Sequence, residues 1–278
     1  MPLSLLFCEG GPNSPDVRIL GKLLAGRCEV RPGGSIHGMG DRIRAYREVL
    51  GGGQVAGVVD GDFRESWPTV RPLEEAEGWA GSDGETLGWR WSRKEIENYL
   101  LDPDVVSRAL GERAPDPEAY QAQLDAAAEA LVAYEAARTA LSICRRRLRP
   151  MPTSWGPQRG RERHPFPDDI SEAGCRSGLR STVEEHSEGQ AVTPDEVLKR
   201  YLDLSPKFAA GAPRRRDFLW TFAGKDLLWV MEAGLKELGL GSGRAFREQV
   251  LLGIEKTPDD ISTWLPEWEA LAAAVQAF

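Results

Sequence analysis

Short apolar runs and helically spaced apolar residues alternate along the first third of the chain. Two nearly continuous apolar runs, at 3–8 and 55–59, are typical of parallel strands that are buried on both faces. Between them, Ser14-Pro15-Asp16 is a typical helix start, and the apolar residues within 17–24 recur at helical spacing. This β-α-β-α-β order predicts an α/β fold with a parallel sheet, flanking helices and right-handed crossovers.

The other elements of this region follow from the same patterns. Residues 64–86 are rich in Glu, Gly and Trp and are predicted to be a loop. The remaining expected elements are a helix ending at about Ala25, a strand near Cys28–Arg31, a helix from about Asp41 to Leu50, a strand at Leu87–Trp91 and an amphipathic helix at Ser92–Leu101.

From about Pro103 onward the pattern becomes helical, with alanines and leucines at helical spacing over 117–148. A stretch rich in Pro, Gly and Arg, at 150–167, is predicted to be a linker or loop. Two further helix starts are expected at Thr193-Pro194-Asp195-Glu196 and Thr257-Pro258-Asp259-Asp260. We therefore expect an α/β catalytic domain over 1–102 and a mostly helical C-terminal region over 103–278.

Composition is typical of a soluble globular protein, with 41% hydrophobic and 28% charged residues. No apolar stretch approaches the roughly 20 residues of a membrane span, and no signal-peptide pattern precedes the first strand. The four cysteines are widely spaced without a C-x-x-C pair, which favours reduced thiols and argues against structural zinc. We expect a cytoplasmic protein without membrane contact.

Charge is distributed unevenly along the chain. The net charge of −8 argues against a protein that coats nucleic acid by bulk electrostatics. Residues 145–180, however, hold nine arginines and four acids, and Arg214, Arg215 and Arg216 form a second basic cluster. Arginine binds phosphate in a bidentate manner, so these clusters fit local nucleic-acid contact; a solvated basic loop is the alternative.

Two acidic clusters carry the candidate chemistry. Glu9-Gly10 ends the first apolar run, and Asp60-Gly61-Asp62 follows the second. The carboxyl ends of parallel strands form the ligand-binding edge of an open α/β sheet, and strand alternation predicts Asp60 and Asp62 on one side. Three convergent carboxylates suit Mg²⁺, which prefers oxygen ligands. Taken singly, each cluster is also an ordinary turn or helix-start sequence.

A third segment, Glu95-Ile96-Glu97-Asn98-Tyr99-Leu100-Leu101, completes a recognisable order of motifs. Together with the two acidic clusters it resembles the TOPRIM nucleases, most closely the OLD-family nucleases and the TOPRIM effector of the PARIS phage-defence system. The resemblance covers residues 3–101. It implies a TOPRIM-type sheet in which Glu9, Asp60 and Asp62 bind Mg²⁺ or Mn²⁺, with Glu95 and Glu97 as the acid-rich helix. A surface helix with Tyr99 packed inward is the alternative.

The resemblance extends to two further residues. Members of the family often have the motif Glu-Gly-x-x-Asp, whereas here Asp16 lies seven positions after Glu9. Asp16 is therefore either the second acid of this motif or an acid that stabilises the positive end of the helix dipole. The segment 220–228 resembles the stretch that supplies a catalytic lysine in OLD-type nucleases, which implies this role for Lys225; an ordinary helix start is the alternative. No G-x-x-x-x-G-K-[ST] motif is present, so the chain has no P-loop.

The resemblance implies a metal-dependent endonuclease that acts on DNA or tRNA as the toxic effector of a phage-defence system. Glu9, Asp60 and Asp62 would hold the metal, Glu97 with Glu95 would complete the site, and Lys225 would stabilise transition-state charge. An ABC-type or AAA ATPase is the implied regulatory partner. The alternatives are an RNA-maturation or primase-like TOPRIM enzyme and a non-catalytic TOPRIM scaffold.

Overall fold

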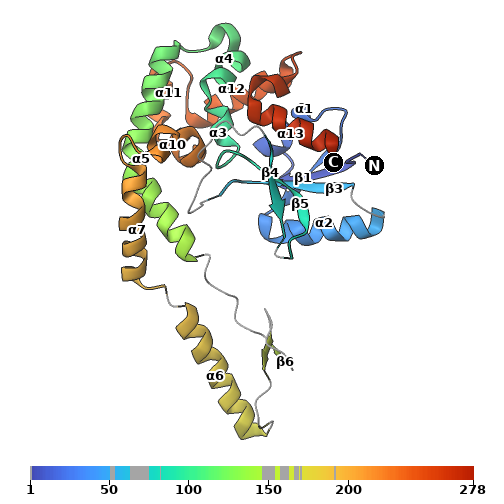
Figure 1. Cartoon of the computed structure of the whole chain (residues 1–278). Helices are drawn as coiled ribbons and strands as arrows, with labels where there is room; N and C mark the ends of the chain where they lie inside the picture. Colours follow the sequence, from blue (N-terminus) through green and yellow to red (C-terminus); the bar gives the residue numbers. More distant parts are fainter. Residues whose placement is uncertain are drawn as a thin grey trace. The chain divides into compact units, whose positions relative to one another are not determined.

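A five-stranded sheet organises the N-terminal part of the chain in the computed structural model (Figure 1). Its strands follow the order β2-β1-β3-β5-β4, and every neighbouring pair is parallel except β4 and β5. The strands are β1 Leu5–Glu9, β2 Glu29–Gly34, β3 Val55–Val59, β4 Glu77–Ala80 and β5 Thr86–Arg90. The structure describes residues 2–50, 54–62, 75–81, 83–145, 154–156, 163–165, 169, 171–190 and 192–278.

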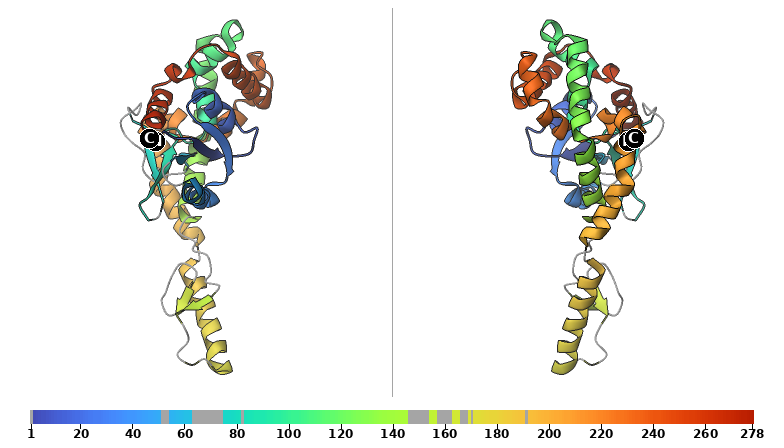
Figure 2. Two further views of the ribbon diagram at one scale, coloured as in Figure 1. Left: turned by 90° about the vertical axis from the view of Figure 1, so that its right-hand side faces the viewer. Right: turned by 90° about the vertical axis from the view of Figure 1, so that its left-hand side faces the viewer.

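The predicted α/β class is confirmed, with helices covering both faces of the sheet. Helix α1 (Pro15–Leu23) begins at the expected cap, where Ser14 Oγ accepts a hydrogen bond from Val17 N at 3.4 Å. Helix α2 (Ile36–Leu50) lies on the opposite side of the sheet from α1, as Figures 1 and 2 show. On the α2 side, Phe7 and Val55 pack in one buried cluster with Ile43.

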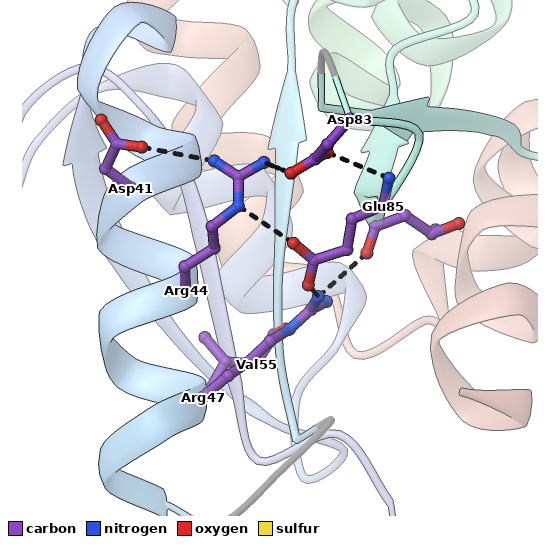
Figure 3. Close-up of polar contacts among 7 residues, drawn as sticks. Asp41, Arg44, Arg47, Val55, Asp83 and Glu85 are labelled. Carbon is purple, nitrogen blue, oxygen red and sulfur yellow. Dashed lines mark hydrogen bonds and ion pairs between the residues drawn. The ribbon is translucent and has the colours of Figure 1, made fainter.

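The antiparallel strand β4 corrects the prediction of a loop over 64–86; residues 63–74 lie outside the described residues. Only Trp79 of this strand is buried, so the segment lacks the apolar run that marks a central strand. Arginines of α2 also fasten the turn between β4 and β5 (Figure 3). Arg44 pairs with Asp83 at 2.8 Å and Glu85 at 3.0 Å, and Arg47 pairs with Glu85 at 2.6 Å.

The rest of the chain is mostly helical, as expected. Its 3₁₀ helices are η1 Gly111–Arg113 and η2 Ile261–Trp264, and two short parallel strands are β6 Ser154–Gly156 and β7 Arg163–Pro165. This strand pair corrects the prediction of a linker or loop over 150–167. The α-helices are α3 Glu97–Leu100, α4 Pro103–Leu110, α5 Pro117–Arg145, α6 Glu172–Gln190, α7 Pro194–Phe208, α8 Pro213–Arg216, α9 Phe218–Thr221, α10 Gly224–Val230, α11 Glu232–Glu237, α12 Gly243–Lys256 and α13 Pro266–Ala277.

Three predicted helix boundaries are wrong. Helix α2 begins at Ile36, ahead of the expected start at about Asp41. The helix expected over Ser92–Leu101 is limited to α3, because the preceding residues bond to a distant segment of the chain. The expected start at Thr257 is instead the end of α12, where Thr257 N donates to Gly253 O at 3.1 Å. The next helix, η2, begins after Asp260, whose side chain accepts from Ser262 N at 3.0 Å. The start at Thr193 is confirmed by α7.

The chain divides into two compact units. Unit 1 comprises residues 1–135 and 207–278, so it joins the sheet to the C-terminal helices; unit 2 comprises residues 136–206. Within unit 1, Arg18 of α1 pairs with Glu248 at 2.8 Å and Glu255 at 2.7 Å, both on α12. All seven candidate site residues belong to unit 1. Among the described residues, no helix has the length and apolar character that a membrane span requires.

Candidate active site at the carboxyl edge of the sheet

The strand order creates a switch point between β1 and β3. The chain leaves β1 for β2 on one side of the sheet, and it continues from β3 to β5 on the other side. Open α/β sheets bind ligands at such a point, beyond the carboxyl ends of the strands. Glu9 is the last residue of β1, and Asp60 directly follows β3, so both stand at this position.

Glu9 and Asp60 are linked directly. Asp60 N donates a hydrogen bond to Glu9 Oε1 at 3.0 Å, which holds the Glu9 carboxylate against the end of β3. Arg90, at the end of β5, donates from Nη1 to Asp60 O at 2.8 Å and fixes the same backbone from the other side. The carboxyl ends of three adjacent strands thus orient these two acids.

The Asp60 side chain has a buried oxygen, Oδ1, that accepts no hydrogen bond from the described residues. Burial raises the pKa of Asp60 well above its usual range, and the nearby carboxylates of Asp16 and Glu9 raise it further. Burial likewise raises the pKa of Glu9. Charged carboxylates in such surroundings are stabilised when a cation is bound between them.

Asp62 does not follow the strand alternation that predicted it beside Asp60. Strand β3 ends at Val59, and Asp62 has a left-handed backbone with φ 57°. Its N donates to Lys94 O at 3.1 Å, which brings the acidic turn against the segment that carries Glu95. Gly61 is required at this approach, since a Cβ there would stand 2.5 Å from Arg93 O. Asp62 still acts on the site, because its charge raises the pKa of Glu9.

Asp16 joins the other acids although its spacing from Glu9 differs from the family pattern. It is 8% exposed, and its Oδ1 accepts a hydrogen bond from Trp91 Nε1 at 2.9 Å. Burial raises the pKa of Asp16 to about 7, against the opposing effect of the Trp91 hydrogen bond, and the charge of Glu97 raises it further. The first turn of α1 therefore contributes a buried carboxylate that interacts electrostatically with both Asp60 and Glu97.

Glu95 and Glu97 lie in a mostly buried segment. The alternative of a surface helix is therefore wrong for Glu97, although Tyr99 packs inward as that alternative expected. Glu97 is 2% exposed, and Tyr99 and Leu100 beside it are also buried. Burial raises the pKa of Glu97, although the ammonium of Lys225 opposes this effect. Glu97 Oε2 is buried without a hydrogen-bond donor among the described residues.

Lys225 is brought to these two acids from the C-terminal part of unit 1. Its Nζ lies 2.9 Å from Glu95 Oε2 and 3.4 Å from Glu97 Oε2, while its backbone N donates to Glu95 Oε1 at 2.6 Å. Burial alone would lower the pKa of Lys225, but the two carboxylates outweigh this effect and raise it, so the side chain carries a positive charge. The lysine is 58% exposed and is accessible from solvent.

A buried clamp holds the 94–98 segment against the 220–225 segment. Glu135 is fully buried and uses both oxygens, accepting from Lys94 Nζ and from Ala223 N, each at 2.8 Å. Asn98 accepts from Glu95 N at 3.0 Å and donates to Phe222 O at 2.9 Å. These contacts fix the spacing between the acids and Lys225. Asn98 belongs to the motif segment that resembles the family, whereas Glu135 was not predicted at all, because its partners lie far away in sequence.

The donors fit a hard divalent cation in chemistry. All the candidate ligands are carboxylates, Asp60 Oδ1 has unused acceptor capacity, and burial and mutual repulsion both disfavour the metal-free charges. Among the residues that the structure describes, no three His, Cys, Asp or Glu side chains are grouped closely enough to hold a metal ion as they stand. The acids surround one region of the sheet edge rather than forming a preassembled ligand set.

The arginine clusters are placed only in part. Arg214 is buried with its guanidinium over the Phe208 ring, and Arg215 donates to Asp125 O at 3.0 Å, so both serve packing within unit 1. This contradicts the assignment of these two arginines to a basic surface cluster for nucleic acid. The third member, Arg216, is exposed and lies 3.5 Å from Asp217 Oδ1. Arg145 is exposed at the end of α5. Arg146, Arg147 and Arg161 lie outside the described residues.

Comparison with known proteins gives no match for this chain, either to a protein-family model or to a curated protein.

Proposed function

We propose that the protein is a divalent-metal-dependent endonuclease whose active site lies at the switch point between β1 and β3. What supports this most is the convergence of acids from separate segments beside an unpartnered buried oxygen of Asp60. Structural ion-pair networks usually satisfy such buried oxygens, whereas sites that bind cations leave them available. The resemblance to TOPRIM nucleases supplies the reaction class.

In this proposal Glu9, Asp60 and Asp62 hold Mg²⁺ or Mn²⁺, and Asp16 neighbours them as a fourth acid. A bound ion would supply a water of lowered pKa and would neutralise charge on the phosphodiester. The backbone amide of Asp60 holds the Glu9 carboxylate in a fixed orientation at the sheet edge, so this candidate ligand is preorganised.

Glu95, Glu97 and Lys225 form the second half of the proposed site. Glu95 anchors Lys225 through both its backbone and its side chain, which aims the ammonium at Glu97. A fixed ammonium at this place would stabilise negative charge as it develops on the phosphate oxygens. Glu97, with an oxygen that accepts no hydrogen bond, would complete the cation site or orient the attacking water.

The regulatory part of the proposal rests on the resemblance alone. In this proposal, a partner ATPase of the ABC or AAA type restrains the nuclease until infection. ATP-dependent control would come from such a partner, because the sequence contains no P-loop motif. Co-expression with any ABC-type or AAA ATPase whose gene is found beside the gene of this protein, followed by size-exclusion chromatography, tests this part. Failure of the two proteins to co-elute would remove the partner from the proposal without affecting the nuclease site.

The nuclease proposal is tested by incubating the purified protein with plasmid DNA and with total tRNA, in Mg²⁺, Mn²⁺ or EDTA. We expect cleavage of at least one substrate with Mg²⁺ or Mn²⁺ and none with EDTA. Cleavage that persists in EDTA would contradict the metal dependence. If neither substrate is cut with either ion, the proposal fails.

A further inference from the structure

Arg247 on α12 is a second cation at the candidate site, and no sequence motif singles it out. Its Nη1 lies 3.6 Å from Glu97 Oε1, whereas Lys225 Nζ lies 3.4 Å from the other oxygen, Oε2. The two cations therefore flank one buried carboxylate. They come from different helices, since Lys225 belongs to α10 and Arg247 to α12.

The hydrogen-bonding capacity of Arg247 is largely unused. Its Nε is buried without a hydrogen-bond partner among the described residues, and its contact with Glu97 is longer than a hydrogen bond. The side chain is 35% exposed, so solvent and ligands reach it. A guanidinium carries five N–H donors in a fixed fork, which suits the oxygens of a phosphate.

The neighbouring cations are committed more firmly. The Lys225 ammonium lies 2.9 Å from Glu95 Oε2 and 3.4 Å from Glu97 Oε2, and Arg90 donates from Nη1 to Asp60 O at 2.8 Å. The site also holds several carboxylates, which repel an incoming phosphate unless cations offset them. Among these three cations, Arg247 is the one with most donors left for a new anionic partner.

We propose that Arg247 binds a phosphate group of the nucleic-acid substrate beside Glu97 and Lys225. This inference rests on the proposed function and deepens it, because it names a residue that contacts the substrate and locates its backbone next to α12. Glu97 is buried between the two cations and pairs with one of them through each carboxylate oxygen. It would thereby hold both cations beside the same phosphate position.

The experiment measures fluorescence anisotropy of a labelled DNA duplex and of labelled total tRNA, in Ca²⁺ and in EDTA, across a range of salt concentrations. The variants are R247Q, which removes the charge, and R247K, which keeps the charge but loses the bidentate fork. The matched control is R244Q, since Arg244 is an exposed arginine in the first turn of α12. Circular dichroism melts confirm that each variant folds.

For a probe that the wild type binds, we expect R247Q to weaken affinity about tenfold or more. The slope of the logarithm of affinity against the logarithm of salt concentration should become shallower by roughly one. R247K should lie between R247Q and the wild type, and R244Q should match the wild type. Wild-type affinity and salt slope in R247Q would overturn the inference, as would an equal loss in R244Q, which would indicate only the general charge of α12.

The two proposals fail in different ways. If the wild type binds a probe through Arg247 but cleaves neither plasmid DNA nor tRNA, the nuclease proposal fails and the phosphate contact stands. If the wild type cleaves a substrate and R247Q cleaves it with unchanged KM and kcat, the Arg247 contact is wrong and the nuclease stands. If the wild type binds neither probe, the Arg247 contact is wrong, and the cleavage assay alone decides the nuclease proposal.

Discussion

Asp16 offers a quantitative test of the electrostatics of the site through the variant D16N. Asp16 is buried in the first turn of α1, and its pKa is raised from an ordinary 3.8 to about 7. Asparagine has nearly the same shape, and its carbonyl oxygen can still accept the hydrogen bond from Trp91 Nε1. The variant therefore removes the charge while keeping the contact.

The sign follows from proton binding in the two states. Between pH 3.8 and about 7 the folded protein keeps a proton that the unfolded chain releases, so stability falls as the pH rises through this window. Each pKa unit is worth about 1.4 kcal/mol. Near pH 5 the cost to the wild type is that of keeping the proton and amounts to up to about 2 kcal/mol; near pH 8 the group is ionised in the folded protein, and the cost is complete at up to about 4 kcal/mol.

The assay is urea unfolding in EDTA, near pH 5 and near pH 8, followed by tryptophan fluorescence. D16N should be more stable than the wild type at both values, with the larger gain near pH 8. D259N is the matched control, because Asp259 is exposed, and it should change little at either pH. If D16N is less stable than the wild type near pH 8, or gains equally at both pH values, Asp16 is not a buried charge of this kind.

Three further predictions concern the same site. The variant E9A should lose cleavage by orders of magnitude while its circular dichroism spectrum and melting temperature stay close to wild type; an unchanged cleavage rate would remove Glu9 from the metal site. The double variant D60N/D62N should melt at a higher temperature than the wild type in EDTA and gain nothing from Mg²⁺, whereas equal stabilisation of both proteins by Mg²⁺ would exclude these two ligands. The variant E135Q should lower the free energy of unfolding by about 3 to 5 kcal/mol, because the buried Lys94 ammonium then keeps neutral acceptors such as Thr221 O but loses the opposing charge of Glu135; a chemical denaturation midpoint equal to wild type would show that the charge of the clamp contributes nothing.

The sheet was largely predictable because its central strands carry their own signal. Strands β1 and β3 are continuous apolar runs buried on both faces, and α1 has a local cap at Ser14. Strand β4 was not predictable in this way. It buries only Trp79, and its place in the sheet depends on pairing with β5 and on the contacts of the following turn with α2.

The candidate site was predictable only where residues stand at strand ends. Glu9 and Asp60 follow from the position of β1 and β3, and the sheet order then places them side by side. The short length of α3 could not be predicted, because Lys94 N bonds to Trp220 O across 126 positions of sequence. The same applies to Arg247, whose relation to Glu97 arises only from the packing of α12.

The left-handed backbone of Asp62 shows why local periodicity was insufficient beside the site. Alternation along an extended strand placed Asp62 on the same side as Asp60, but the strand ends at Val59. The turn is instead set by the bond from Asp62 N to Lys94 O and by the close approach of Gly61 to Arg93. Both contacts join segments that are about thirty residues apart.

The central claim is that the acids at the switch point between β1 and β3 bind a divalent cation. Calorimetric titration of Mn²⁺ into the wild type, the double variant E9Q/D60N and the control D259N tests it most directly. We predict saturable binding to the wild type and to D259N, and its loss in E9Q/D60N while that variant remains folded. Saturable binding of equal affinity and stoichiometry in all three proteins would contradict the claim.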